Sequence, residues 1–272
     1  MLQLSGVGDP AVLGRAGVAV VHAAPGVGEN LADHYAVRIA ARVRGTGSLN
    51  ERAHGPRLAI EVLKYLFARR GILGSAVAHA YGFVRVAADA ARPDVQLLFA
   101  PACYENGKVG QADVEHLPGL TCGVAQLRPR SRGHVRIESN DPLRAPLIQP
   151  NFLTEPEDCE ILLGGIQFVR RLFAATPMAQ YIESETWPGP AAATGRELIA
   201  FARSTGSTVY HPVGSCRMGG ANAPLDPALR VRGLDRLRVI DASAMPAMVS
   251  GNTYAATIMI AGKGAHMLPA GE

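Results

Sequence analysis

One histidine and one asparagine in the C-terminal part of the sequence have the chemistry needed to oxidise an alcohol. His211 stands within residues 210–219, YHPVGSCRMG, and Asn252 stands within residues 250–253, SGNT. Oxidation removes a proton from the alcohol oxygen and a hydride from its carbon. A neutral imidazole, with a reference pKa of about 6.5, is suited to taking that proton at neutral pH. Asn252 has no basic group, so its amide can only orient the substrate oxygen by hydrogen bonding.

A helix is expected over residues 253–268, directly after Asn252. Its first turn would present unpaired backbone N–H groups and the positive end of the helix dipole. Such a terminus would stabilise the negative charge that a flavin gains on its pyrimidine edge when it is reduced. Ser250 or Asn252 is expected to cap this helix.

Each of these residues also has a plain structural interpretation. His211 could be a packed or turn histidine, and Asn252 could serve only as a helix cap. Asp241 follows an apolar segment and could simply form a turn, while Asp33 and His34 could cap a turn without holding any ligand. Only the order and spacing of these residues favour the functional interpretation.

The hydrophobic pattern predicts an α+β fold built around an antiparallel sheet, because strands are mixed with separate helices. Helices are expected over residues 10–16, 56–70, 155–174, 195–204 and 253–268. Strands are expected over residues 18–21, 35–43, 79–87, 94–100, 120–128, 133–138 and 237–240.

The composition is that of a globular protein, with 272 residues of which 48% are hydrophobic and 18% charged. The net charge of +4 is scattered, and the densest basic cluster, at 128–132, is too short to indicate a nucleic-acid surface. No apolar run reaches the roughly 18–20 residues of a membrane span. The four cysteines form no Cys-x-x-Cys pair, and the first residues do not resemble a signal peptide. We therefore expect a cytoplasmic protein without a transmembrane segment or a nucleic-acid partner, and leave peripheral membrane association open.

Several common catalytic motifs are absent from the sequence. It has no Gly-x-Gly-x-x-Gly, no P-loop, no Gly-x-Ser-x-Gly and no His-Glu-x-x-His. Its eight histidines are dispersed, so we expect no metal site.

Six segments, spread over most of the chain, together resemble the glucose–methanol–choline (GMC) flavoprotein oxidoreductases, in particular the bacterial choline- and alcohol-dehydrogenase-like members. They are LSGVG at 4–8, PGVGENLADH at 25–34, RGHVRI at 132–137, PNFL at 150–153, HPVGSCRMG at 211–219, and DAS with SGNT at 241–253. The resemblance implies FAD as the cofactor, with His211 as the active-site base and Asn252 as its partner. It also implies a set of residues along the FAD, namely Asp33, His34, Asp241, Ala242, Asn252 and Thr253.

The resemblance further implies a division into domains. Residues 36–225 would form the substrate-binding domain with its antiparallel sheet. Residues 1–35 and 226–272 would belong to an incomplete Rossmann-like FAD-binding domain, because the family's N-terminal half, with its Gly-x-Gly-x-x-Gly, has no counterpart in this sequence. A smaller departure lies in the last helix, where Gly262 stands at a position that is usually Glu in the family.

The function implied is FAD-dependent oxidation of a primary alcohol to an aldehyde, with hydride transfer to the flavin N5. With 6% aromatic residues the chain favours a neutral alcohol over choline. The electron acceptor, which could be oxygen, a quinone or a protein, is left open. The alternative is an inactive chain that cannot hold FAD without the N-terminal half, and a third possibility is assembly with a separately encoded N-terminal half.

Overall fold

The computed structural model describes residues 1–104 and 114–268, and the chain divides into two compact units. We call residues 35–126 with 159–207 the sheet unit, and residues 1–34, 127–158 and 208–272 the terminal unit. The contacts within each unit place two internal segments, 127–158 and 208–225, with the two termini. The sequence-based division assigned both segments to the substrate-binding domain. That division by function stays a prediction.

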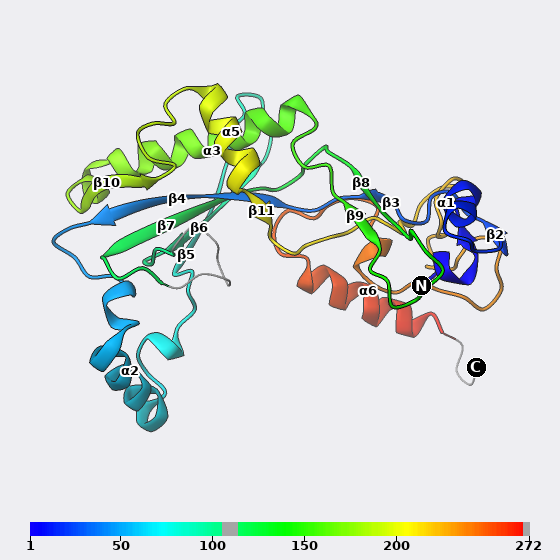
Figure 1. Cartoon of the computed structure of the whole chain (residues 1–272), viewed down its shortest axis with the longest axis horizontal. Helices are drawn as coiled ribbons and strands as arrows, with labels where there is room; N and C mark the ends of the chain where they lie inside the picture. The colour runs from blue at the N-terminus through cyan, green and yellow to red at the C-terminus, as the bar shows by residue number, and fades with distance from the viewer. Residues whose placement is uncertain (105–113, 269–272) are drawn as a thin grey trace. The chain divides into compact units, whose positions relative to one another are not determined.

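The sheet unit is built on an antiparallel sheet with the strand order β10-β4-β7-β6-β5, and a short strand β11 (Ser207–Thr208) also pairs with β4 (Figure 1). The strands are β4 (Tyr35–Val43), β5 (Ala80–Val84), β6 (Val95–Ala100), β7 (Gly119–Gln126) and β10 (Ile182–Trp187). In β4, Val37, Ile39 and Ala41 are buried while Arg38 and Ala40 are half-buried, as the alternation of side chains in a strand requires. The predicted α+β class with an antiparallel sheet is confirmed.

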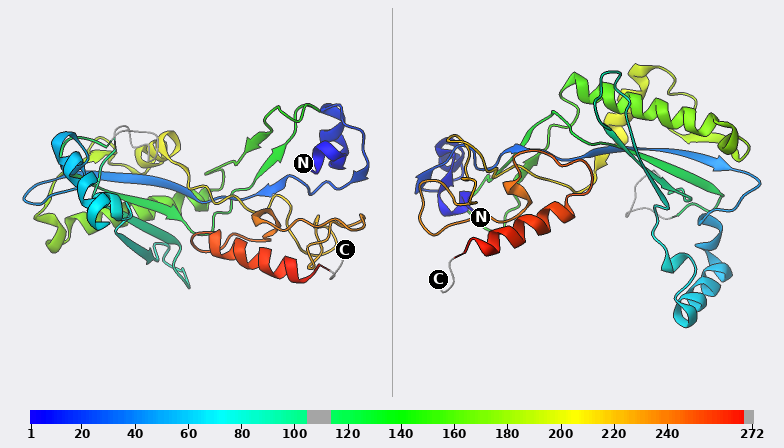
Figure 2. Two further views of the ribbon diagram at one scale, coloured as in Figure 1. Left: turned by 90° about the horizontal axis from the view of Figure 1, so that it is seen from below. Right: turned by 180° about the vertical axis from the view of Figure 1, so that it is seen from behind.

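Two helices, α3 (Pro156–Ala174) and α5 (Gly195–Thr205), lie on one side of this sheet (Figures 1 and 2). Arg170 in α3 binds Glu185 of β10 through two hydrogen bonds of 3.0 and 2.7 Å. A bidentate pair of this kind fixes the helix against the strand. Two more helices lie in the described part of the unit, α2 (Gly55–Ala68) and the short α4 (Thr176–Ala179).

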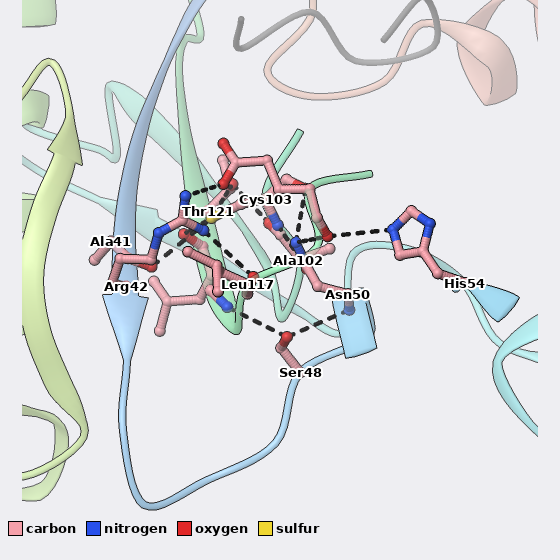
Figure 3. Close-up of polar contacts among 12 residues, drawn as sticks. Ala41, Arg42, Ser48, Asn50, His54, Ala102, Cys103, Leu117 and Thr121 are labelled. Atoms are coloured by element: carbon pink, nitrogen blue, oxygen red, sulfur yellow. Dashed lines mark hydrogen bonds and ion pairs between the residues drawn. The ribbon is translucent and has the colours of Figure 1, made fainter. Parts of the chain in front are cut away.

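The loops at one end of the sheet are joined by the buried amide of Asn50 (Figure 3). Its Nδ2 donates to the carbonyl oxygens of Cys103 and Glu115, at 3.0 and 2.8 Å, and its Oδ1 accepts from the backbone N–H of Cys103 at 2.9 Å. Asn50 opens the 3-10 turn η2 (Asn50–Arg52), which precedes α2, and a second such turn, η3 (Ile72–Gly74), follows α2.

The described residues of the terminal unit form two small sheets and two α-helices. Strands β1 (Val7–Gly8) and β2 (His22–Ala23) pair in parallel, and β3 (Glu29–Leu31), β8 (Gly133–Arg136) and β9 (Leu147–Gln149) form an antiparallel sheet. The helices are α1 (Pro10–Arg15) and α6 (Tyr254–His266), and 3-10 turns lie at η1 (Gln3–Ser5) and η5 (Ala242–Ala244). A buried apolar cluster joins the distant segments of the unit: Val7, Val27, Ala32, Val213, Cys216, Leu225, Leu229, Val231, Ala244, Met245, Met248 and Ile260.

Two predicted strands of this unit are wrong. Residues 18–21 form no strand, because the chain pairs one step later, at His22 and Ala23, and leaves Val20 and Val21 exposed. Residues 237–240 make only an isolated bridge between Arg230 and Arg238 and are half-buried. The expected cap of the last helix is also wrong, because Thr253 occupies the N-cap and makes no side-chain capping hydrogen bond.

Candidate functional site

His211 lies in an extended segment that is held on both sides by backbone hydrogen bonds within the terminal unit. Ala32 and Val213 exchange two N–H···O bonds of 3.0 and 2.8 Å, and the N–H of Gly28 donates to Ser215 at 2.7 Å. The N–H of Cys216 donates to Ser243 on the other side at 3.0 Å. The segment that carries the imidazole is therefore part of the folded core of this unit.

The ring of His211 faces the ring of His34, with the two Nδ1 atoms 2.9 Å apart and the rings edge to face. The other ring nitrogen of His34, Nε2, lies 3.0 Å from the carbonyl oxygen of Leu127 and 3.1 Å from that of Val249. Carbonyl oxygens only accept hydrogen bonds, so the Nε2 atom of His34 carries a proton.

The protonation state of His34 then determines the tautomer of His211. Burial lowers the pKa of His34 to about 4, so this ring is neutral at pH 7 and its Nδ1 can only accept. The proton between the two rings therefore belongs to the Nδ1 atom of His211. The Nε2 atom of His211 is left with its lone pair, which is the state that a general base needs.

Asn252 lies at this free nitrogen, with its Nδ2 atom 3.4 Å from the Nε2 atom of His211. The amide is positioned by its neighbours, since the preceding Gly251 has a φ of 115°, a conformation that side chains rarely allow. The Ser250 hydroxyl accepts a hydrogen bond of 2.8 Å from Arg128. Asn252 and His211 thus present an amide and an imidazole lone pair at the same point.

The side chain of Asp33 holds the backbone of the same histidine. Its Oδ1 atom accepts from the N–H of His211 at 3.0 Å, and its Oδ2 atom accepts from the hydroxyl of Thr208. Burial raises the pKa of Asp33, and this is opposed by its hydrogen bonds. Burial also lowers the pKa of His211, while the nearby Asp33 carboxylate acts in the opposite direction by favouring the imidazolium.

The structure thus brings together four of the predicted residues: His211, Asn252, Asp33 and His34. Both Asp33 and His34 have protein partners here, and a role for them in FAD binding stays a prediction. Thr208 was missed, and no local motif could have revealed it, because it contributes only through its contact with Asp33, 175 positions away in sequence.

The remaining predicted residues lie elsewhere in the terminal unit. The Oδ1 atom of Asp241 accepts from the N–H of Ser243 at 2.8 Å and caps η5, whose first residue is Ala242. The carbonyl of Thr253 accepts from both the N–H and the hydroxyl of Thr257, at 2.9 Å each, at the start of α6. Nothing in the structure tests their predicted contact with FAD.

Two further observations concern metal sites and membrane-spanning helices. Among residues 1–104 and 114–268, no three His, Cys, Asp or Glu side chains gather closely enough to hold a metal ion. Within the same residues, no helix combines the length and the apolar character needed to cross a bilayer.

Comparison with known proteins bears directly on the predicted resemblance. Residues 129–261 match the family model for the C-terminal domain of the GMC oxidoreductases. An alcohol dehydrogenase [acceptor] of Pseudomonas putida is 40% identical over 270 residues, which are 98% of this chain and 48% of the relative. Oxygen-dependent choline dehydrogenase 1 of Chromohalobacter salexigens is 39% identical over 97% of this chain and 47% of its own length.

Solved structures agree with this relationship. A formate oxidase variant of Aspergillus oryzae, studied for its FAD modification, aligns with a TM-score of 0.88 and 27% identity, over 98% of this chain and 51% of that one. Pyridoxine 4-oxidase aligns with a TM-score of 0.80 and 26% identity, over 97% and 48%. The chain spans about half the length of the curated relatives that it matches. The predicted resemblance is confirmed: residues 129–261 form a GMC oxidoreductase C-terminal domain, and almost the whole chain is similar to alcohol- and choline-dehydrogenase relatives.

Proposed function

We propose that the terminal unit supplies the proton-handling half of an FAD-dependent alcohol oxidation, in which a primary, neutral alcohol becomes an aldehyde. The observation that carries this proposal is the 2.9 Å contact between the Nδ1 atoms of His211 and His34, from which we infer that Nδ1 of His211 carries the proton and that its Nε2 lone pair faces Asn252. An alcohol hydroxyl that replaces the amide contact would donate its proton to that lone pair.

Three features of His211 suit it to this task. Burial lowers its pKa, so the neutral base form prevails at neutral pH. Its backbone N–H is tied to Asp33 and its ring to His34, so the imidazole does not have to be ordered when substrate binds. Asn252 lies beside the lone pair and would hydrogen-bond the substrate oxygen, holding it in line for proton transfer.

The start of α6 fits a flavin, the cofactor of this family. The helix begins two residues after Asn252, and the Thr253 side chain makes no capping hydrogen bond, so the first turn keeps N–H donors for a ligand. A helix N-terminus favours negative charge nearby, as a reduced pyrimidine ring would carry. Bound FAD would supply the hydride acceptor, at its N5 atom. Asp241, Ala242 and Thr253 remain our proposed contacts along it.

One observation supports the rival proposal, in which this chain does not catalyse on its own. Helix α6 exposes large apolar side chains, with Tyr254, Ile258 and Met259 at 76%, 56% and 62%. Such a face normally packs against another part of a protein. The rival proposal is that FAD is held only when an N-terminal half, in the same or another chain, covers this face.

An absorbance spectrum of the purified chain separates the two proposals. A bound-flavin band after addition of FAD supports catalysis by this chain, whereas a colourless, aggregating protein supports the need for an N-terminal half. The same spectrum is then recorded for the protein encoded by the longest natural reading frame that contains this sequence. Whichever of the two proteins binds FAD serves as the flavin-loaded enzyme in the experiments below.

In the flavin-loaded form, His211→Ala should lower turnover of a primary alcohol by on the order of a hundredfold or more and leave FAD bound. A matched control is His266→Ala, which changes an exposed histidine of the same unit. Parental turnover by His211→Ala with flavin retained would refute the base assignment.

A series of neutral primary alcohols measured against choline tests the substrate class, and oxygen, a soluble quinone and a redox protein are compared as acceptors. A cytoplasmic location stays a prediction.

A further inference from the structure

Helix α2 of the sheet unit carries its large apolar side chains on the outside. Ile60, Leu63, Leu66 and Phe67 are 52%, 53%, 60% and 85% exposed, and we call these four residues the α2 stripe. Residues three, four and seven positions apart share one face of a helix, so Ile60, Leu63 and Phe67 form a continuous row with Leu66 beside it. A single exposed apolar residue is ordinary, but a row of this length marks an interaction surface.

The opposite face of α2 is anchored by a buried carboxylate. Glu61 is 3% exposed, and its Oε2 atom accepts from the backbone N–H of Ile72 at 3.0 Å. Its Oε1 atom lies 2.7 Å from the ammonium group of Lys64. Rotating the helix to bury the stripe would break the contact between Glu61 and Ile72 and expose the Glu61 face, so the outward orientation of the stripe is built into the local structure.

The base of α2 is fixed while its length projects away from the strands of the same unit (Figures 1 and 2). The preceding turn η2 is tied down by the buried Asn50, and the ring of His54 at the N-cap lies 3.4 Å from the carbonyl of Glu115 (Figure 3). Within residues 1–104 and 114–268, the most extensive contacts between α2 and other elements are those with its own flanking turns, η2 and η3. The stripe is therefore held outward, and among the described residues its four side chains are largely exposed.

Cationic side chains surround the stripe. Arg57, Lys64, Arg69 and Arg70 are all exposed, and the buried Glu61 is the only acidic residue between positions 52 and 88. The helix has 14 residues, a length of about 21 Å at 1.5 Å per residue. A short helix with an apolar face and basic margins suits the plane of a membrane interface, where the apolar face enters the acyl boundary and the cations meet anionic headgroups.

We propose that α2 is a membrane-docking helix that binds the surface of an anionic lipid bilayer through the α2 stripe. The charge distribution favours this occupant over a second copy of the chain. An isologous contact between two stripes would bring their basic margins, including Arg57 and Arg70, against each other and leave like charges unpaired. A bilayer of anionic lipids instead neutralises those margins along the whole length of the helix.

Vesicle co-sedimentation of the purified chain tests the proposal. The chain should bind vesicles of equal parts phosphatidylglycerol and phosphatidylcholine at least about tenfold more tightly than vesicles of phosphatidylcholine alone. Leu63→Ser with Phe67→Ser should reduce binding to the anionic vesicles at least about tenfold, because the apolar anchor is lost. Arg57→Gln with Arg70→Gln should weaken binding to anionic vesicles and leave the weak binding to neutral ones unchanged.

The matched control replaces two apolar residues of the terminal unit that are at least as exposed, Val21→Ser with Leu143→Ser, and should bind as the parent does. Far-UV circular dichroism of each variant checks that the fold is retained. Failure of the parent to bind anionic vesicles, or parental binding by the stripe variant, would overturn the proposal. Sedimentation equilibrium supplies a further test: an oligomer that the stripe substitutions dissociate would identify a second copy as the occupant and also overturn it.

Discussion

The Nδ1 atoms of His34 and His211 lie 2.9 Å apart, and this contact determines which nitrogen of His211 keeps a lone pair. His34 is bound at its other nitrogen by two carbonyl oxygens, of Leu127 and Val249, so it can only accept from His211. A residue of the N-terminal GVGENLADH segment thereby sets the tautomer of a residue in the C-terminal HPVG segment. We regard His34 as a positioning residue, since it acts on substrate only through His211.

His34→Phe should lower alcohol turnover of the flavin-loaded enzyme by on the order of a hundredfold, because the wrong tautomer of His211 becomes accessible. The phenyl ring keeps much of the volume but offers no acceptor to the Nδ1–H of His211. The measurement is steady-state turnover at saturating alcohol, together with the flavin spectrum to establish that cofactor is still bound.

The control for this substitution is His266→Phe, at an exposed position near the end of α6, which should leave turnover within about twofold of the parent. A His34→Phe enzyme that is folded, holds flavin and turns over at the parental rate would remove His34 from the mechanism.

The pH dependence of kcat/KM should report the protonation of His211. Only the neutral imidazole accepts a proton, so the rate rises with pH and levels off above a midpoint that lies below the usual 6.5, because burial lowers the pKa of His211. The Asp33 carboxylate raises that pKa by stabilising the imidazolium. Asp33→Asn should therefore move the midpoint to lower pH.

An Asn side chain at position 33 can still accept from the N–H of His211 through its Oδ1 atom, so this contact with His211 is kept while the charge is removed. Asp89→Asn removes an exposed carboxylate of the sheet unit and should leave the midpoint unchanged. A midpoint that rises, or stays in place, in Asp33→Asn would contradict the electrostatic coupling between Asp33 and His211.

Burial of His34 should also make the stability of the chain depend on pH. The folded-state pKa, about 4, lies below the unfolded value of 6.5, so between these values the unfolded chain binds more protons than the folded one. The stabilisation is complete above pH 6.5 and is lost as the pH falls from 6.5 toward 4. The difference between the two pKa values corresponds to about 3 kcal/mol.

Urea denaturation of the parent and of His34→Phe at several pH values between 4 and 7.5 checks this contribution. The free energy of unfolding of the parent should fall more steeply on acidification than that of the variant, which has no titrating group at position 34. Parallel pH profiles for the two proteins would show that His34 does not titrate differently in the folded and unfolded states.

Local patterns were enough to predict the elements that bury one face. The alternation from Tyr35 to Val43 predicted β4, and the acidic first turn and basic last turn predicted a helix at 155–174, which the structure places at Pro156–Ala174. The first pattern reports burial of one face of a strand and the second reports charges that complement a helix dipole, and a short window of sequence records both.

The errors and omissions share a physical cause, which is dependence on a distant partner. Val20 and Val21 have strand propensity, but the segment that pairs with Val7 and Gly8 begins only at His22. Likewise the residues of the candidate site could be named from motifs, whereas the ring contact joins residues 177 positions apart and no periodicity reveals it. The tautomer of His211 could be inferred only once Leu127 and Val249 had been placed beside His34.

Two glycines in α6, Gly262 and Gly264, provide a matched pair for testing how this helix packs. Glycine inside a helix costs about 1 kcal/mol relative to alanine, so the same substitution at both sites makes the same gain in helix propensity. A Cβ at Gly262 would meet nothing within 4 Å, whereas a Cβ at the buried Gly264 would collide with the Cγ2 atom of Ile240. The two alanines should therefore have opposite effects.

We expect Gly262→Ala to raise the free energy of unfolding by about 1 kcal/mol and Gly264→Ala to lower it by about 1–3 kcal/mol, since overpacking outweighs the gain in propensity. Thermal denaturation of the two variants beside the parent gives both values. The double variant Gly264→Ala with Ile240→Val shortens the side chain that obstructs the new Cβ. It should not fully restore stability, because valine keeps the Cγ2 atom that a Cβ at position 264 would meet. Gly264→Ala with Ile240→Ala removes that branch and should make the alanine at 264 favourable relative to Ile240→Ala alone. A stabilising Gly264→Ala in the parent background would mean that α6 does not pack on Ile240.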